Sequence, residues 1–216
     1  MGLISPSILT GKQIYRDVCE AKKPWDTPLS SELKKRWEKW EEQLPCEQLV
    51  PRPIVHYEED IEAIELHSFG DASISGVGTA IYAVVRQKSG TTQQLVAAKS
   101  RLAKQRLTVP RLELVAAHMA TNLLMNVKNA LDNVPLPKLY GWLDSTVALH
   151  WIKRNGQYKQ FVANRVTKIQ LHKEIEWRYV PTDVNPADLA SRGAQVSDSQ
   201  LWWTRPKWLS DPKTMA

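Results

Sequence analysis

Long apolar runs are absent from this 216-residue sequence, and no segment approaches the ~20 apolar residues that a membrane-spanning helix needs. The N-terminus lacks the basic-then-apolar pattern of a secretory signal. Only two cysteines occur, Cys19 and Cys46, and their spacing matches no metal-ligand pattern. We therefore expect a soluble, intracellular protein with free thiols rather than a disulfide scaffold or a membrane protein.

Acidic charge is scarce in the larger part of the chain. Residues 61–216 hold 20 Lys and Arg against 12 Asp and Glu, a net charge of +8, whereas residues 1–60 hold 9 against 11, a net charge of −2. A basic surface is typical of nucleic-acid-binding proteins, although ordinary solubilising charge explains the same excess. The basic region is therefore the candidate for a polyanionic partner.

The first 55 residues are expected to be helical. One helix is predicted over residues 7–22, before Pro24. A second has apolar residues at spacings of four, four, three and four, which share one helix face: Leu29, Leu33, Trp37, Trp40 and Leu44. Two helices are too few to bury these faces, so we expect the end of a larger domain, followed by a proline-marked linker.

From residue 61 the pattern changes to strands. Strands predicted over 61–71, 77–86 and 94–100 are joined by short turns and form an antiparallel meander. A long helix follows, with Thr108 as its cap and Pro110 in its first turn.

The remaining core alternates between strands and helices. A strand is predicted over 139–143, helices over 145–153 and 160–173, a strand over 175–180, and a final helix between Asn185 as cap and Gly193 as stop. Strands that are connected through helices run parallel. The predicted fold is α/β, with a five-stranded mixed sheet of three antiparallel strands and then two parallel ones, and helices on both faces.

Four acidic residues occupy matching positions in this topology. They lie at strand ends or helix starts: Asp71, Glu113, Asp144 and Asp188. Such positions gather at one edge of the sheet, where crevice sites form. A single acid at a helix start is more often a cap or a partner of the helix dipole, so only the combination points to a site.

Carboxylates brought together repel one another, at ~4 kcal/mol for a pair 4 Å apart at an effective dielectric near 20. An ionised cluster therefore needs cations, and hard oxygen ligands select Mg²⁺ or Mn²⁺ rather than zinc. Two such ions support phosphodiester cleavage. The pattern predicts a two-metal nuclease centre.

Five sequence strings resemble the RNase H domain of Bel-Pao retrotransposons. Their order and spacing match that family: SFGDAS (68–73), PRLEL (110–114), WLDST (142–146), FVANRV (161–166) and NPADLASRG (185–193). Residues 2–6 and 25–40 resemble the stretch after the polymerase domain, and 201–209 the segment after the nuclease. One departure is Arg205, where the family often has Gly.

The resemblance implies a fragment of a retrotransposon Pol polyprotein with a type 1 RNase H-like fold. It divides the chain into a helical remnant of the reverse transcriptase connection region (1–57), an RNase H-like domain (58–196) and a Trp-rich C-terminal tail (197–216). It also implies endonucleolytic hydrolysis of the RNA strand of RNA–DNA hybrids during reverse transcription. Asp71, Glu113, Asp144 and Asp188 would be the catalytic metal ligands for two Mg²⁺ or Mn²⁺ ions, with Asp71 bridging both.

The implied partners are the hybrid and the reverse transcriptase and integrase regions of the same polyprotein, with no membrane. The implied location is the cytoplasm, in virus-like particles, and the nucleus. No polymerase Tyr-x-Asp-Asp or integrase His-His-Cys-Cys motif occurs, so this chain is expected to lack both activities. Residues 181–184 also lack the loop histidine of cellular RNases H, which lowers the expected rate.

Five further residues are candidates for binding nucleic acid. Ser73 and Ser145 each lie close behind an acid, where hybrid backbone contacts are expected, although a turn or cap role explains them equally well. Lys99, Arg101 and Arg111 cluster before Glu113, where either phosphate binding or a solvated face accounts for them.

Two alternatives to the enzyme remain open. The domain could be a non-catalytic hybrid-binding or tethering module, although all four acids remain. The chain could also be a decayed copy of an element that folds poorly because the N-terminal helices lack a partner.

Overall fold

The computed structural model describes residues 2–44, 47–48, 50, 53–131, 135, 137–154, 156–197, 199–204 and 206–210. Within these residues Cys19 is an exposed free thiol, as expected. Cys46 and Arg205 lie outside the described residues. In the part of the chain covered, no helix combines the length and the apolarity needed to cross a membrane.

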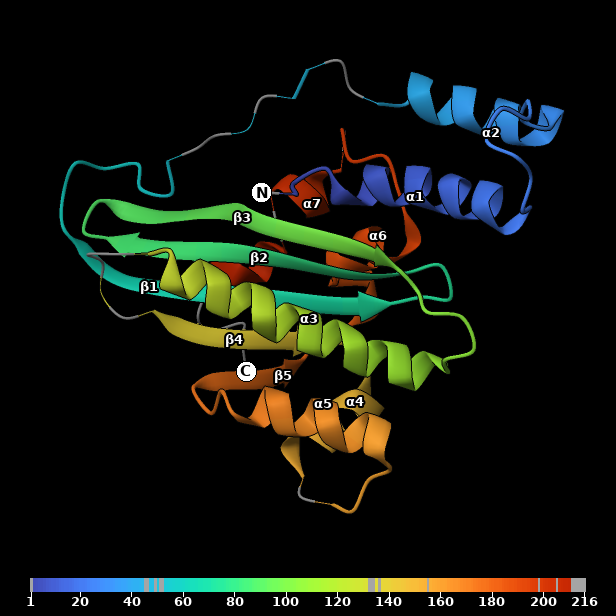
Figure 1. Cartoon of the computed structure of the whole chain (residues 1–216). Coiled ribbons are helices and arrows are strands. Elements are labelled where there is room, and N and C mark those ends of the chain that lie inside the picture. Colours follow the sequence, from blue (N-terminus) through green and yellow to red (C-terminus); the bar gives the residue numbers. More distant parts are fainter. Residues whose placement is uncertain are drawn as a thin grey trace.

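Five strands form one mixed sheet in the order β3-β2-β1-β4-β5 (Figure 1). The strands are β1 (Ile61–Ala72), β2 (Gly76–Gln87), β3 (Gly90–Leu102), β4 (Lys138–Leu143) and β5 (Ile175–Tyr179). β1, β2 and β3 pair antiparallel, whereas β4 pairs parallel with β1 and β5 pairs parallel with β4. The predicted topology is confirmed.

Helices cover both faces of the sheet, as predicted (Figure 1). One face carries α3 (Val109–Asn129), α4 (Thr146–Lys153) and α5 (Gln160–Gln170). The other carries α6 (Ala187–Arg192) and α7 (Gln200–Thr204), while α1 (Ser5–Glu20) packs on edge strand β3 and on α6. α2 (Ser31–Glu42) packs on α1, and two 3-10 turns complete the elements: η1 (Thr182–Val184) and η2 (Lys207–Ser210).

Two apolar layers hold the helices to the sheet. Leu66, Leu114 and Ile169 belong to the layer beneath α3, α4 and α5, and all are at most 1% exposed. Phe69 and Tyr82 belong to the opposite layer, which the C-terminal segment covers. β2 is buried at every position but one because both of its faces are covered.

The start of α3 differs from the prediction. The Thr108 side chain makes no capping hydrogen bond, although Thr108 is the N-cap residue by its backbone. Pro110 lies in the first turn as expected. Because α3 begins at Val109, Glu113 is its fifth residue and stands just beyond the first turn.

α1 is not the partnerless helix that its sequence predicts. Leu9 and Ile14 are 0% and 2% exposed. Lys12 Nζ donates to Ser100 O at 3.0 Å, and Ser7 Oγ donates to Ala194 O at 3.1 Å. α1 is therefore packed onto the sheet domain, whereas α2 has no buried residue.

The Trp-rich tail also packs onto the sheet. Trp202 is fully buried, and its Nε1 donates to Leu3 O at 2.7 Å. Tyr82 Oη donates to Trp202 O at 2.6 Å. Trp208 packs against Trp142, with the ring centroids 4.6 Å apart. The two ends of the described chain therefore meet over β2 and complete the second apolar layer.

Candidate metal centre

Two of the four acids come from neighbouring parallel strands. The last register partners of β1 and β4 are Gly70 and Leu143. Asp71 follows one of them and Asp144 follows the other. The parallel pairing therefore places both carboxylates at the same edge of the sheet, as the sequence predicts.

The third acid is brought in by close packing of α3 on β1. A Cβ atom at Gly70 would lie 3.0 Å from Leu143 Cδ2 and 3.4 Å from the Ala116 backbone. Glycine thus lets α3 approach the end of β1. Glu113 projects from α3 at this point and is 7% exposed.

One oxygen each from Asp71, Glu113 and Asp144 lies within 4.8 Å of the others. Glu113 Oε2 and Asp144 Oδ1 are buried, and within the described residues neither has a hydrogen-bond partner. A buried carboxylate oxygen without a partner costs free energy unless a cation or donor reaches it. The three acids therefore fit a divalent cation: hard, negatively charged oxygens with free lone pairs that converge.

Burial strongly raises the pKa of two of these carboxyl groups. Burial raises the pKa of Glu113 to about 9, and the charges of Asp71 and Asp144 add to it. Burial likewise raises the pKa of Asp71 to about 6, although the hydrogen bond from Ser191 opposes the shift. A cation that binds the cluster at neutral pH would therefore displace the proton that the raised pKa of Glu113 retains.

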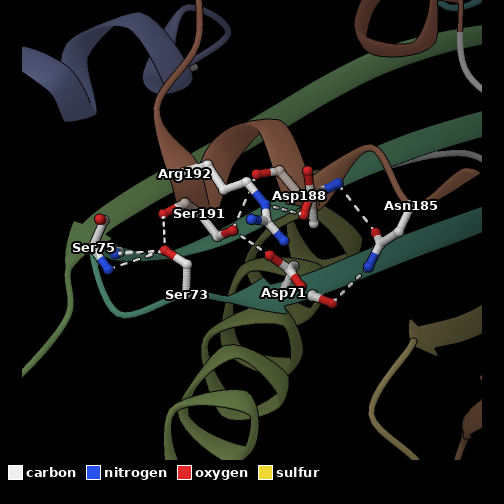
Figure 2. A network of polar contacts seen from close by, with 10 residues as sticks. Asp71, Ser73, Ser75, Asn185, Asp188, Ser191 and Arg192 are labelled. Atoms are coloured by element: carbon white, nitrogen blue, oxygen red, sulfur yellow. Dashed lines mark hydrogen bonds and ion pairs between the residues drawn. The ribbon is translucent and has the colours of Figure 1, made fainter. Parts of the chain in front are cut away.

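Asp188 is the one predicted ligand that the structure leaves outside this group. It is the second residue of α6, and its Oδ1 accepts a hydrogen bond from Arg192 Nε at 2.5 Å. Its charge still raises the pKa of Asp71 and of Glu113. Asp188 therefore stands beside the cluster, with its carboxylate bound to an arginine one turn further along α6 (Figure 2).

Polar contacts fix α6 to the end of β1, as Figure 2 shows. Asn185 Oδ1 accepts from the Ala187 amide at 3.1 Å, and its Nδ2 donates to Gly70 O at 3.2 Å. Ser191 Oγ donates to Asp71 Oδ2. The sequence indicated Asn185 only as a helix cap and gave no role to Ser191. Ser191 follows Asp188 by three residues, so both lie on one face of the helix, and this spacing could have indicated that Ser191 belongs to the site.

The two serines that were predicted to contact nucleic acid already form hydrogen bonds within the protein. Ser73 Oγ donates to Ser191 O at 2.7 Å and accepts from the amides of Ser75 and Gly76. Ser145 Oγ caps α4 by accepting from the Ala148 amide at 3.2 Å. Their contacts with nucleic acid stay a prediction.

The three predicted basic residues lie around α3. Lys99 and Arg101 are exposed on β3. Arg111 is partly buried in the first turn of α3, where its guanidinium lies over the Phe161 ring. Their phosphate contacts also stay a prediction.

A family model described as a Pao retrotransposon-like RNaseH-like domain matches residues 1–145. The match therefore takes in α1 and α2 and includes Asp71, Glu113 and Asp144, and it ends before Asp188. No curated protein sequence matches the chain.

Several solved structures are similar at low identity. The N-terminal RNase H domain of rv2228c from Mycobacterium tuberculosis is 16% identical, covering 62% of this chain and 93% of that one, with a TM-score of 0.41. LC11-RNase H1, solved with an RNA/DNA hybrid, is 14% identical over 61% and 96%, with a TM-score of 0.41. The foamy viral protease-reverse transcriptase, also solved with a hybrid, is 16% identical over 78% and 26%, with a TM-score of 0.39.

Proposed function

The chain belongs to the Pao retrotransposon-like RNase H-like domain family, and from this premise we propose that it hydrolyses the RNA strand of RNA–DNA hybrids. The observation that carries the proposal is the convergence of Asp71, Glu113 and Asp144, with one oxygen of each within 4.8 Å of the others. No membership in a family supplies such a site by itself, because related folds host many functions. In this chain the three converging acids supply a site that could hold a metal ion.

Asp71, Glu113 and Asp144 would hold divalent cations, which we take to be two Mg²⁺ ions with Mn²⁺ as the substitute. Such ions activate a water molecule and stabilise the leaving oxygen in phosphodiester cleavage. Asp71, which Ser191 orients, would be one of the residues that hold the ions. Asp188 would join them once its carboxylate leaves Arg192.

The substrate would be recognised by shape and by its 2′-hydroxyl groups rather than by sequence. The basic excess of residues 61–216 suits a phosphate backbone. In a replicating element the cleavage would remove the RNA template after first-strand synthesis. We place it in cytoplasmic virus-like particles and in the nucleus, next to the reverse transcriptase and integrase regions of one polyprotein.

The test is cleavage of an end-labelled RNA–DNA hybrid by the purified chain, with Mg²⁺ and then with EDTA. Asp71→Asn and Asp144→Asn should reduce cleavage to the level seen in EDTA while circular dichroism stays unchanged. Asp183→Asn is the matched control, because Asp183 is an exposed acid in η1 and lies outside the cluster. Metal-dependent cleavage that survives both cluster variants would refute the proposal.

The rival function is hybrid binding without cleavage. The ion pair between Asp188 and Arg192 favours this rival, because an Asp188 carboxylate that is bound to arginine leaves only three acids to hold the metal. Binding of the hybrid without cleavage at any Mg²⁺ or Mn²⁺ concentration would establish this rival.

A further inference from the structure

Two arginines from different helices share one aromatic ring. Arg165 Cζ lies 3.7 Å from the centroid of the Phe161 ring, and Arg111 Cζ lies 5.5 Å from it. Arg165 Nη1 also donates to Phe161 O at 3.0 Å. Cation–π contacts at such distances restrain a guanidinium group. The first turn of α3 and the second turn of α5 therefore present two guanidinium groups held beside one ring.

Neither arginine has an acidic partner within the part of the chain that is described. The ion pairs found there involve other residues. Arg165 Nε is buried and, among the same residues, no hydrogen-bond acceptor reaches it. Partial burial also lowers the pKa of Arg165. Two restrained positive groups with unused donors are stabilised when an anion binds them.

Further positive charge surrounds this arginine pair. Burial lowers the pKa of His118 on α3, and the charges of Lys168, Arg165 and Arg101 lower it further. Lys168 lies one turn beyond Arg165 on α5, and Arg101 projects from β3. His118 follows Arg111 by seven residues, so both occupy one face of α3. The positive potential therefore extends along α3 away from its first turn.

The arginine pair is close to the metal centre but separate from it. Arg111 precedes Glu113 by two residues, which corresponds to about 3 Å along the helix axis and about 200° around it. The two side chains therefore leave α3 on different sides. A nucleic-acid strand has a phosphate every ~3.4 Å of helix axis, so a backbone at the metal centre has further phosphates close by.

We propose that Arg111 and Arg165, aligned by the Phe161 ring, form a binding site for a backbone phosphate of the nucleic-acid duplex, separate from the phosphate that is cleaved. This inference rests on the proposed function, since it takes a duplex as the ligand. Arginine suits the role because its planar group binds phosphate with two parallel hydrogen bonds. The site fixes the position of the duplex and reads no base, as backbone contacts do.

The test separates binding from cleavage. A short fluorescein-labelled RNA–DNA hybrid is titrated with the full chain in EDTA, where metal-dependent cleavage cannot run, and fluorescence anisotropy is followed at several salt concentrations. Arg111→Gln and Arg165→Gln should each weaken binding about tenfold. Each should also lower the slope of log K against log salt by about 1. Arg16→Gln is the control, because it removes the same charge from α1 and should change the affinity less than about twofold.

Two more variants exclude a folding defect and a plain charge effect. Arg165→Lys keeps the charge but loses the planar donors, so it should recover the salt slope and only part of the affinity. The double variant Arg111→Gln with Arg165→Gln should weaken binding less than the product of the single effects, because both groups hold one phosphate. Equal losses in the Arg16→Gln control, or unchanged binding in both single variants, would overturn the proposal, as would a wild-type chain that does not bind the hybrid. Arginine-dependent binding without Mg²⁺-dependent cleavage would keep the phosphate site and refute the nuclease alone.

Discussion

Arg192 Nε donates a hydrogen bond to Asp188 Oδ1 at 2.5 Å, across one turn of α6. The same carboxylate stands beside the three converging acids Asp71, Glu113 and Asp144, and its charge raises the pKa of Asp71 and of Glu113. A cation bound by the cluster would therefore compete with the arginine for the Asp188 carboxylate. α6 is held in place by other contacts, from Asn185 and Ser191, so the competition concerns the carboxylate rather than the helix.

Replacing Arg192 should lower the amount of Mg²⁺ that the chain requires. Arg192→Gln removes the competitor, so half-maximal cleavage is expected at a severalfold lower Mg²⁺ concentration. The free energy of unfolding should change by less than about 1 kcal/mol, because the arginine side chain is 64% exposed and such surface pairs contribute little. Mg²⁺ titrations of the rate and urea unfolding check the two parts. An unchanged or higher Mg²⁺ requirement would show that Arg192 does not compete.

Stability without metal should fall as the pH rises. The pKa of Glu113 is raised to about 9 and that of Asp71 to about 6, so between about pH 4 and pH 9 the folded chain holds protons that the unfolded chain releases. A state that binds more protons is favoured at low pH, so the stability present near pH 4.5 is lost progressively towards pH 9. Thermal melting in EDTA should give a Tm at pH 8.5 that is lower than at pH 6 by about 4 °C or more.

Two controls belong to this melting experiment. Glu113→Gln removes the main titrating group, so its Tm in EDTA should vary less with pH than that of the wild type. Mg²⁺ should raise the wild-type Tm more at pH 8.5 than at pH 6, because ligands must lose their protons before they bind metal. A wild-type Tm that rises from pH 6 to pH 8.5 in EDTA would contradict the assignment of raised pKa values.

The order of elements was predictable because it depends on local patterns. Alternating strands, Pro110 in the first turn of α3 and Gly193 directly after α6 can all be predicted from a few neighbouring residues. Asp71 and Asp144 were predictable as neighbours, because parallel strands bring their carboxyl ends to one edge. These parts of the fold required no knowledge of distant contacts.

The unpredicted parts depend on contacts between residues far apart in the sequence. α1 was expected to lack a partner, yet Ser7 binds Ala194, 187 residues away. No local pattern carries that information. The ion pair of Asp188 with Arg192 is different, because an acidic and a basic residue four positions apart on a helix predict such a pair from the sequence. A pattern alone does not decide whether the acid binds an arginine or a metal.

Asn185 should be essential to the position of α6. It is fully buried and joins the helix start to Gly70 O at the end of β1. Asn185→Ala removes the hydrogen bonds to Gly70 O and from the Ala187 amide, which should lower the free energy of unfolding by about 2 kcal/mol. Mg²⁺ affinity measured by calorimetry should fall as well, because α6 carries both Asp188 and the Ser191 hydroxyl that orients Asp71. Asn164→Ala, at an exposed position of α5, should change neither quantity, and equal effects of the two variants would refute the role of Asn185.

Trp202 should contribute more to stability than any exposed tryptophan. Its ring is 0% exposed, its Nε1 donates to Leu3 O, and the Tyr82 hydroxyl donates to its carbonyl oxygen, so it ties the tail and the N-terminus to β2. Trp202→Ala opens a cavity in the second apolar layer and should lower the free energy of unfolding by about 4 kcal/mol. Trp25 is 92% exposed, and Trp25→Ala should change that free energy by less than about 0.5 kcal/mol. Urea unfolding followed by circular dichroism compares the two, and a Trp202→Ala chain as stable as Trp25→Ala would mean that the tail does not belong to the folded core.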